Sequence, residues 1–177
     1  MNNRVNFETG GVFLPITRRG FLILSLGVIM FPFAVPRAYG EGKTMSIKIE
    51  QIHKPEEELK RMLTPEQFSV LREEGTERPY SSPLNGEKRK GEYVCAGCDL
   101  SLFTSEMKFD SGTGWPSFFT SIEGHLATKR DFKLIFPRTE YHCARCGGHH
   151  GHLFNDGPAP TGQRWCNNGV ALKFIPA

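Results

Sequence analysis

Five cysteines are the residues of this 177-residue sequence whose types and spacing most directly suggest chemistry. Four of them form two Cys-x-x-Cys pairs, Cys95/Cys98 and Cys143/Cys146. The fifth, Cys166, stands in the stretch RWCNNG, with no cysteine close to it in sequence. A cysteine left over from pairs is either a small buried residue or a reactive thiol. The pairs and the single cysteine therefore predict different chemistry.

The two Cys-x-x-Cys pairs are typical of a structural zinc site. Each turn presents two thiolates, and two turns supply the four sulfurs of a tetrahedral site for one zinc ion. The pairs are far apart in the sequence, so a sheet is expected between the two turns. Two disulfides or a redox-active dithiol are the alternatives. A disulfide within Cys-x-x-Cys closes a very short loop and stabilises little, which favours the metal.

The neighbours of Cys166 suggest a reactive thiol. In a strand, Arg164, Cys166 and Asn168 share one face, and Trp165 and Asn167 share the other. A cationic neighbour favours the thiolate, which is the nucleophile. An asparagine amide can donate a hydrogen bond to a developing negative oxygen. The alternative is that Cys166 is a small core residue.

A cluster of histidines in GGHHGHLFNDG is a second candidate for chemistry. Strict strand alternation puts His150 and His152 on one face and His149 on the other. A bulge at Gly151 would break that alternation. The sequence therefore leaves open which pair converges, and metal ligation or simple surface exposure are alternatives.

The stretch DSGTGWPSFF supplies a third candidate. Gly112 and Gly114 give the chain a flexible approach, and Pro116 fixes it after Trp115. Trp115 is either the wall of an apolar pocket or a core residue.

The elements that position these residues are short strands and a few small helices. Thr64-Pro65-Glu66-Gln67 is a capping box with proline at the first helical position, which predicts a helix ending near Gly75. A shorter helix is expected from Pro55, carrying Leu59 and Met62 on its apolar face. After Gly91, short β-rich runs alternate with turn residues. The sequence predicts a mainly β, mostly antiparallel domain with helices at its N-terminal side.

Residues 1–40 have the layout of an export signal. Arg18-Arg19 precede an apolar run, and Ala38-Tyr39-Gly40 place small residues before a possible cleavage site. The paired arginines are similar to those of a twin-arginine signal. This layout predicts export from the cytoplasm to a bacterial periplasm, with 41–53 as a linker and 54–177 as the domain. The alternative is an uncleaved segment that anchors the chain to the membrane.

The charge of the sequence argues against nucleic acid as a partner. Residues 1–40 hold four of the 22 basic residues and one of the 19 acidic residues. The rest of the chain carries 18 of each and is neutral. A neutral domain of this kind offers no basic surface for binding the phosphate backbone of a nucleic acid. This weakens the alternative of an RNA-binding zinc ribbon.

Together these residues resemble the methionine-R-sulfoxide reductases, from about Lys60 to Pro176. The resemblance is carried by TERPYSSPLN, the two Cys-x-x-Cys pairs, LFTSEMKFDSGTGWPSF, CARCGGHHGHLFNDGPAPTG and RWCNN. It implies a β-tent fold of two antiparallel sheets with a four-cysteine structural zinc site, away from the chemistry. It also implies substrates that are oxidised proteins or peptides containing methionine-R-sulfoxide.

The resemblance implies a role for each candidate residue. Cys166 is similar to the family's nucleophile, which becomes a sulfenic acid, and Trp115 to the wall that accepts the substrate methyl group. His149 and His152 correspond to the two active-site histidines and Asn168 to the asparagine after the nucleophile. The surrounding polar, substrate-binding positions are matched by Arg164 and Asp156.

Four departures from the family pattern affect the expected mechanism. Thr113 stands where many members carry a second, resolving cysteine, so the expected reductant is an external small thiol or thioredoxin-like protein. His150 replaces a usual leucine and is expected to add a titrating group near the site. Asn167 replaces a usual aliphatic residue, and Gly169 a usual serine.

Three other classes of function remain as alternatives to a reductase. They are a zinc-ribbon binding module without catalysis, a thiol–disulfide oxidoreductase using one of the pairs, and a purely structural secreted domain.

Overall fold

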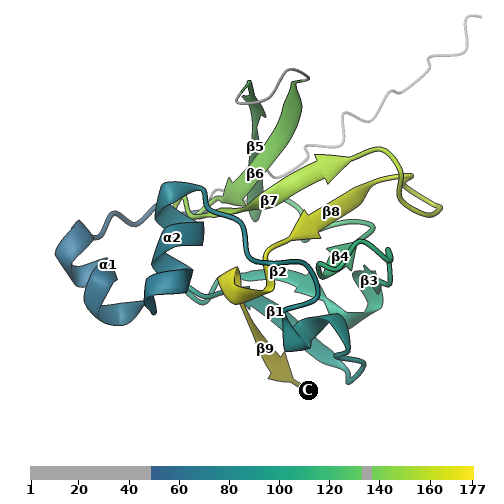
Figure 1. The fold of residues 1–177 in the computed structure, drawn as a ribbon, viewed down its shortest axis with the longest axis horizontal. Helices are drawn as coiled ribbons and strands as arrows, with labels where there is room; N and C mark the ends of the chain where they lie inside the picture. The colour runs from purple at the N-terminus through teal and green to yellow at the C-terminus, as the bar shows by residue number, and fades with distance from the viewer. Residues whose placement is uncertain (1–48, 133–136) are drawn as a thin grey trace, which may run out of the picture. The chain divides into compact units, whose positions relative to one another are not determined.

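A computed structural model describes residues 49–132 and 137–177 of the chain (Figure 1). The export signal expected at 1–40, and most of the linker expected at 41–53, lie outside these residues. Two α-helices open the described chain, α1 (Glu56–Met62) and α2 (Pro65–Glu73). Nine strands follow: β1 (Gly91–Cys95), β2 (Ser101–Thr104), β3 (Lys108–Phe109), β4 (Ser117–Phe118), β5 (Leu126–Asp131), β6 (Arg138–Cys143), β7 (His149–Phe154), β8 (Arg164–Asn167) and β9 (Leu172–Pro176). Three short 3-10 helices lie at Pro83–Asn85, Ser105–Met107 and Gly169–Ala171.

The capping box predicted at Thr64 forms as expected. The Gln67 backbone N–H donates to Thr64 Oγ1 at 3.2 Å, and the Thr64 N–H donates to Gln67 Oε1 at 3.1 Å. The helix ends at Glu73, before Gly75, because Glu74 adopts a left-handed conformation with φ of 57°. In α1, Leu59 is buried as expected, whereas Met62 is 54% exposed and does not join the apolar face.

The strands form the two antiparallel sheets that the family resemblance implied. One sheet has the order β2-β1-β9, and the other has the order β3-β4-β8-β7-β6-β5. Figure 1 shows α1 and α2 together at one side of the sheets. The mainly β fold with two small N-terminal helices is therefore confirmed.

Aromatic rings fill the space between the sheets. Phe103 of β2 stacks on Phe118 of β4 with ring centroids 4.0 Å apart. Tyr141 of β6 meets Trp165 of β8 edge to face at 5.0 Å. Such pairs add specific geometry to the burial of apolar area. Because Trp165 points into this core, its neighbour Cys166 points to the other face of β8.

The described part of the chain contains no helix that is long and apolar enough to cross a membrane.

Candidate active site

Cys166 lies in the middle of the larger sheet, on a strand that is paired along both edges. In β4, Ser117 is the backbone partner of Cys166, and in β7 the partner is His152. Directly opposed residues of an antiparallel pair share a face with their Cβ atoms about 5 Å apart. The sheet register therefore places a histidine beside the thiol.

The β7 strand reaches this position because it passes very close to β8. A Cβ on Gly151 would lie 1.9 Å from the carbonyl oxygen of Cys166, so only glycine fits there. The neighbouring β6–β7 pairing shifts register, since Tyr141 pairs with Gly151 but His142 pairs with His149. A bulge therefore exists, but its extra residue is His150 and not Gly151.

The bulge decides which histidines converge. His149 moves to the face of His152, and their ring centroids are 5.6 Å apart. This is the pair that the family resemblance implied and that strict alternation did not give. His150 points to the other face, where it is fully buried beside Cys95. The expectation that His150 titrates near Cys166 is therefore wrong, because the bulge turns it into the core.

Acidic side chains fix the orientation of both rings. The Nδ1 atom of His149 is 2.8 Å from Glu140 Oε1, and both side chains are only 4% exposed. The His149 Nε2 atom is buried with no hydrogen-bond partner among the described residues. The Nε2 atom of His152 is 3.0 Å from Asp131 Oδ2, which also accepts from Arg138 at 2.7 Å. Burial lowers the pKa of His152.

A cavity of about 150 Å³ opens over Cys166. Its walls combine the aromatic rings of Trp115 and Phe154 with polar groups, as small-molecule sites commonly do. The residues around it are Thr76, Trp115, Arg138, Gly151, His152, Phe154, Cys166, Asn167 and Asn168. The structure thus makes Trp115 a pocket wall and not a core residue.

A loop held by Tyr80 and Glu77 carries Trp115. The Tyr80 hydroxyl donates to the Gly112 carbonyl at 2.6 Å, and the Tyr80 N–H donates to the Gly114 carbonyl at 2.7 Å. Gly114 has φ of 93°, which favours glycine. The indole Nε1 donates to the Glu77 carbonyl at 3.2 Å. These bonds fix the indole plane at the cavity wall.

Asn168 lies just beyond the end of β8, and its amide joins three parts of the chain. Its Oδ1 accepts from the Glu77 N–H at 3.0 Å, and its Nδ2 donates to the His150 carbonyl at 2.9 Å. One of its two N–H donors is therefore already used. The Glu77 carboxylate accepts from the N–H groups of Gly169 at 2.6 Å and Val170 at 2.9 Å. Burial raises the pKa of Glu77.

Burial and a nearby cation act in opposite directions on Cys166. Burial raises the pKa of the Cys166 thiol, and the Arg164 guanidinium and a hydrogen bond with the Thr113 side chain partly oppose the increase. Asp156 holds Arg164 through two hydrogen bonds of 2.8 and 2.9 Å, and the guanidinium lies 4.3 Å above the Phe154 ring. Arg164 acts in the predicted direction, but burial outweighs it, so the resting group is the neutral thiol.

The four paired cysteines converge at a separate place. Their sulfurs all lie within 4.8 Å of one another, with Cys95 to Cys146 at 3.6 Å and Cys98 to Cys143 at 3.5 Å. All four are free thiols, so neither pair forms the alternative disulfide. Sulfurs bound at about 2.3 Å around a tetrahedral ion lie about 3.8 Å apart, so this donor set fits a metal ion. Metal binding requires these cysteines as thiolates.

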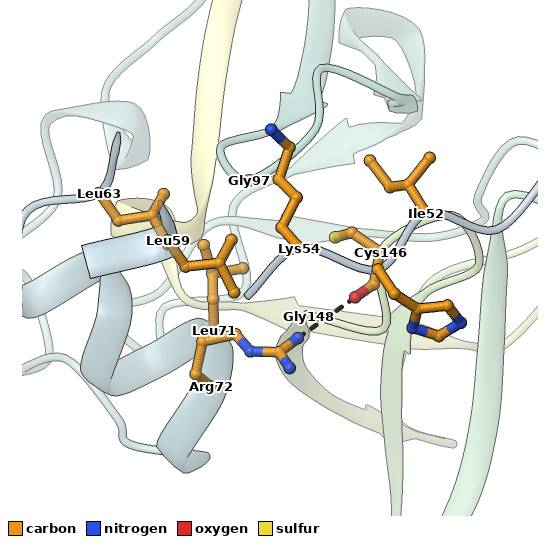
Figure 2. Close-up of a pocket in the computed structure, with 10 residues that line it drawn as sticks. Ile52, Lys54, Leu59, Leu63, Leu71, Arg72, Gly97, Cys146 and Gly148 are labelled. Carbon is orange, nitrogen blue, oxygen red and sulfur yellow. Dashed lines mark hydrogen bonds between the residues drawn. The ribbon is translucent and has the colours of Figure 1, made fainter. Parts of the chain in front are cut away.

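One wall of the metal site faces a small cavity, shown in Figure 2. The cavity holds about 40 Å³, enough space for water. Cys146 lies at its wall, and Arg72 donates to the Cys146 carbonyl at 3.2 Å. The Ile52 N–H donates to the Arg145 carbonyl at 2.8 Å, so the segment before α1 stabilises the turn between Cys143 and Cys146.

Residues 63–176, more than half of the chain, match the SelR domain. The chain belongs to the SelR domain family. It is 53% identical over 124 residues to the peptide methionine sulfoxide reductase MsrB of Methanosarcina barkeri, which is 70% of this chain and 87% of the relative. It is 51% identical over 128 residues to the MsrB of Bradyrhizobium diazoefficiens, covering 72% and 92% of the two chains. A chloroplastic relative, peptide methionine sulfoxide reductase B1 of Arabidopsis thaliana, is 50% identical over 120 residues, covering 67% and 59%.

Several residues of this SelR domain contribute to the site but were missed by sequence reasoning. Glu77, Glu140, Asp131 and Arg138 orient groups around the pocket. Their signal in the sequence is weak, because charged residues are usually exposed and only the fold buries these carboxylates. Glu77 follows α2, and its burial could be recognised only once the packing of that helix was known.

Proposed function

We propose that this SelR domain reduces methionine-R-sulfoxide in proteins and peptides to methionine, with Cys166 as the nucleophile. The observation that carries the proposal is the placement of Cys166 opposite His152, whose ring lies 5.6 Å from that of His149, in a pocket that Trp115 also lines, in a chain about half identical to peptide methionine sulfoxide reductases. The chemistry needs a thiol, a group that handles the proton of the departing oxygen, and an apolar seat for the S-methyl group. The pocket contains one of each.

In the proposed reaction the Cys166 sulfur attacks the sulfoxide sulfur and forms a transient S–S bond. The oxygen then moves to the Cys166 sulfur as the S–O and S–S bonds break, the thiol proton ends on that oxygen, and the thioether leaves. A thiol and a sulfoxide become a sulfenic acid and a thioether, so Cys166 is oxidised by two electrons and the substrate is reduced by two. Because burial raises the pKa of Cys166, its proton leaves as the sulfur attacks. In this proposal, His149 Nε2 and His152 hold the oxygen and transfer that proton.

Trp115 and Phe154 form the apolar part of the pocket, where the methyl group of the substrate would sit. Asn168 acts as a positioning residue through Glu77 and His150, with one N–H left for the substrate oxygen. Arg164, held by Asp156, stabilises negative charge on the Cys166 sulfur. This assignment follows the residue types implied by the family resemblance.

Regeneration of Cys166 requires an external reductant. Position 113 is a threonine and not a cysteine, and the other four cysteines are gathered in the metal site. One external thiol attacks the sulfenic acid, releasing water and forming a mixed disulfide, and a second thiol releases Cys166. A small thiol or a thioredoxin-like protein supplies these electrons.

Zinc is the metal proposed for the four-cysteine site, since four thiolates in tetrahedral arrangement suit it. Cys95, Cys98, Cys143 and Cys146 would hold the ion, which would join the turn after β1 to the turn after β6. Its contribution is structural, and the reaction at Cys166 uses only protein groups.

The proposed place of repair is outside the cytoplasm, in a bacterial periplasm. Support comes from the leader alone, with Arg18-Arg19, an apolar run and small residues before Glu41. Cell fractionation of the tagged full chain, compared with an Arg18→Lys/Arg19→Lys variant, tests the proposal. Cytoplasmic retention of only the variant is expected, and equal distribution of both would contradict it.

A single-turnover assay tests the reaction. The purified zinc-loaded protein is mixed without reductant with a peptide containing either the R or the S epimer of methionine sulfoxide. One methionine per chain is expected from the R epimer, with loss of the Cys166 thiol and full retention of zinc. Cys166→Ser, which keeps the fold and the metal, must produce none. Turnover by that variant, or equal turnover of both epimers, would contradict the proposal.

A further inference from the structure

His150 is a buried polar residue that the proposed reaction does not use. Its side chain is fully buried, and its ring lies parallel to that of Tyr141, with centroids 6.5 Å apart. The Nε2 atom is 3.3 Å from Cys95 Sγ, within hydrogen-bonding distance for sulfur. A histidine of the catalytic segment therefore touches a ligand of the metal site.

The chemistry of the two atoms sets the direction of this contact. A neutral imidazole has one N–H donor and one acceptor nitrogen. A metal-bound thiolate has no proton and can only accept. The hydrogen therefore sits on Nε2 and points at the sulfur.

The other nitrogen of His150, Nδ1, is buried with no hydrogen-bond partner among the described residues. Asn167 is a polar neighbour of the ring. Asn167 is itself fully buried and immobilised, since its Oδ1 accepts from the Tyr141 hydroxyl at 2.9 Å and its Nδ2 donates to the Asn168 carbonyl at 2.6 Å. With Nδ1 unpartnered, the contact with Cys95 Sγ is the hydrogen bond that orients the ring.

We propose that His150 is an outer hydrogen-bond donor of the four-cysteine metal site, with its Nε2–H donating to the Cys95 thiolate. A divalent ion with four thiolates carries a net charge of about −2, which is costly inside a protein without donors. Cys95 is completely buried and faces the interior, so a protein group must supply its donor.

The opposite side of the metal site is built differently. There Cys146 borders the small cavity of Figure 2, which Lys54 and Arg72 also line, so two cationic side chains lie on that side. A chelator or oxidant would approach from the Cys146 side. His150 stabilises the interior side and slows the loss of the ion once the outer sulfur is released.

The hydrogen bond is directly observable in the wild-type protein. We expect the full chain with ¹¹³Cd in place of zinc to show a scalar coupling between the metal and the His150 Nε2 proton. Such a coupling requires an N–H···S–Cd path and would not arise from packing alone. A His150 ring with its proton on Nδ1 would overturn the proposal, whatever the variants do.

Metal release tests the consequence. Zinc transfer to an excess of a chromogenic chelator is followed for the wild type, His150→Leu and His150→Gln. The leucine variant should release zinc about 10- to 100-fold faster, as is typical when an outer partner of a ligand is lost. Glutamine, which keeps an N–H donor, should restore most of the difference.

Two comparisons distinguish the hydrogen bond from packing. His125→Leu removes a histidine bonded to the Ser101 carbonyl instead of a sulfur, and should leave zinc release unchanged. The cobalt-loaded leucine variant should show shifted sulfur-to-cobalt absorption bands. Equal release rates for wild type and His150→Leu would overturn the proposal, as would glutamine and leucine variants that release zinc equally fast.

Discussion

His152 and Cys166 face each other directly across the β7–β8 pair. Because His150 is the extra residue of the bulge, His149 joins them on the same face. The local arrangement is thus set by one backbone irregularity and one close approach, that of Gly151 to the Cys166 carbonyl. The proton-transfer groups of the proposed reaction depend on this register.

The first prediction concerns the histidine pair. His149→Asn and His152→Asn should each reduce kcat/KM for a methionine-R-sulfoxide peptide, because each removes a group that transfers a proton in the proposed step. Losses of about 10²- to 10⁴-fold are usual for such groups. Steady-state assays with dithiothreitol measure the effect, with zinc content and circular dichroism as checks of folding. His125→Asn is the matched control. An equal loss of kcat/KM in that variant would contradict a specific role for His149 and His152.

The second prediction concerns the pH dependence of Cys166. Burial raises the pKa of its thiol above the ordinary 9.0, so the thiolate is scarce at neutral pH and increases only as the pH rises past that value. Alkylation of Cys166 by iodoacetamide, followed by mass spectrometry of its peptide in zinc-loaded protein, should have a midpoint above pH 9.0. Arg164→Met should move the midpoint higher, because the guanidinium lowers the pKa. Asp156→Asn should move it lower, because the carboxylate raises it.

A midpoint below 9.0 in the wild type would mean that the cation outweighs burial. Shifts of the same sign in the two variants would mean that they act by disturbing the Arg164–Asp156 pair rather than by their charges.

The sequence allowed much of this site to be predicted, because local patterns encode local structure. The capping box at Thr64, the two cysteine turns and the alternating faces of β8 depend on residues close together in the chain. The histidine pair could not be derived from alternation, because the bulge at His150 depends on pairing with β6. The roles of Glu77 and Glu140 depend on partners distant in sequence, and the sign of the Cys166 pKa shift depends on burial.

The third prediction concerns Glu77 as a positioning residue. Its carboxylate accepts from two backbone N–H groups, and Glu77→Gln leaves one of them facing an amide N–H. An unsatisfied buried donor costs about 1–3 kcal/mol. We therefore expect a lower Tm for the zinc-loaded variant and a larger change in KM than in kcat, since Trp115 and Asn168 are both bonded to the Glu77 backbone. Exposed Glu66→Gln is the control, and an unchanged Tm and KM in the Glu77 variant would contradict this role.

The fourth prediction concerns Thr113, whose side chain lowers the pKa of the Cys166 thiol. Because this effect acts only at short range, Thr113→Cys should trap the sulfenic acid as an intramolecular disulfide. After one equivalent of sulfoxide without reductant, this variant should show a disulfide between position 113 and Cys166 by mass spectrometry, and no adduct with dimedone. The wild type should give the dimedone adduct, and so should Ser81→Cys, which places a thiol on the exposed neighbouring loop. A persistent adduct in Thr113→Cys would mean that the loop carrying residue 113 moves away from Cys166 during turnover, and that Thr113 does not stay bonded to the oxidised sulfur.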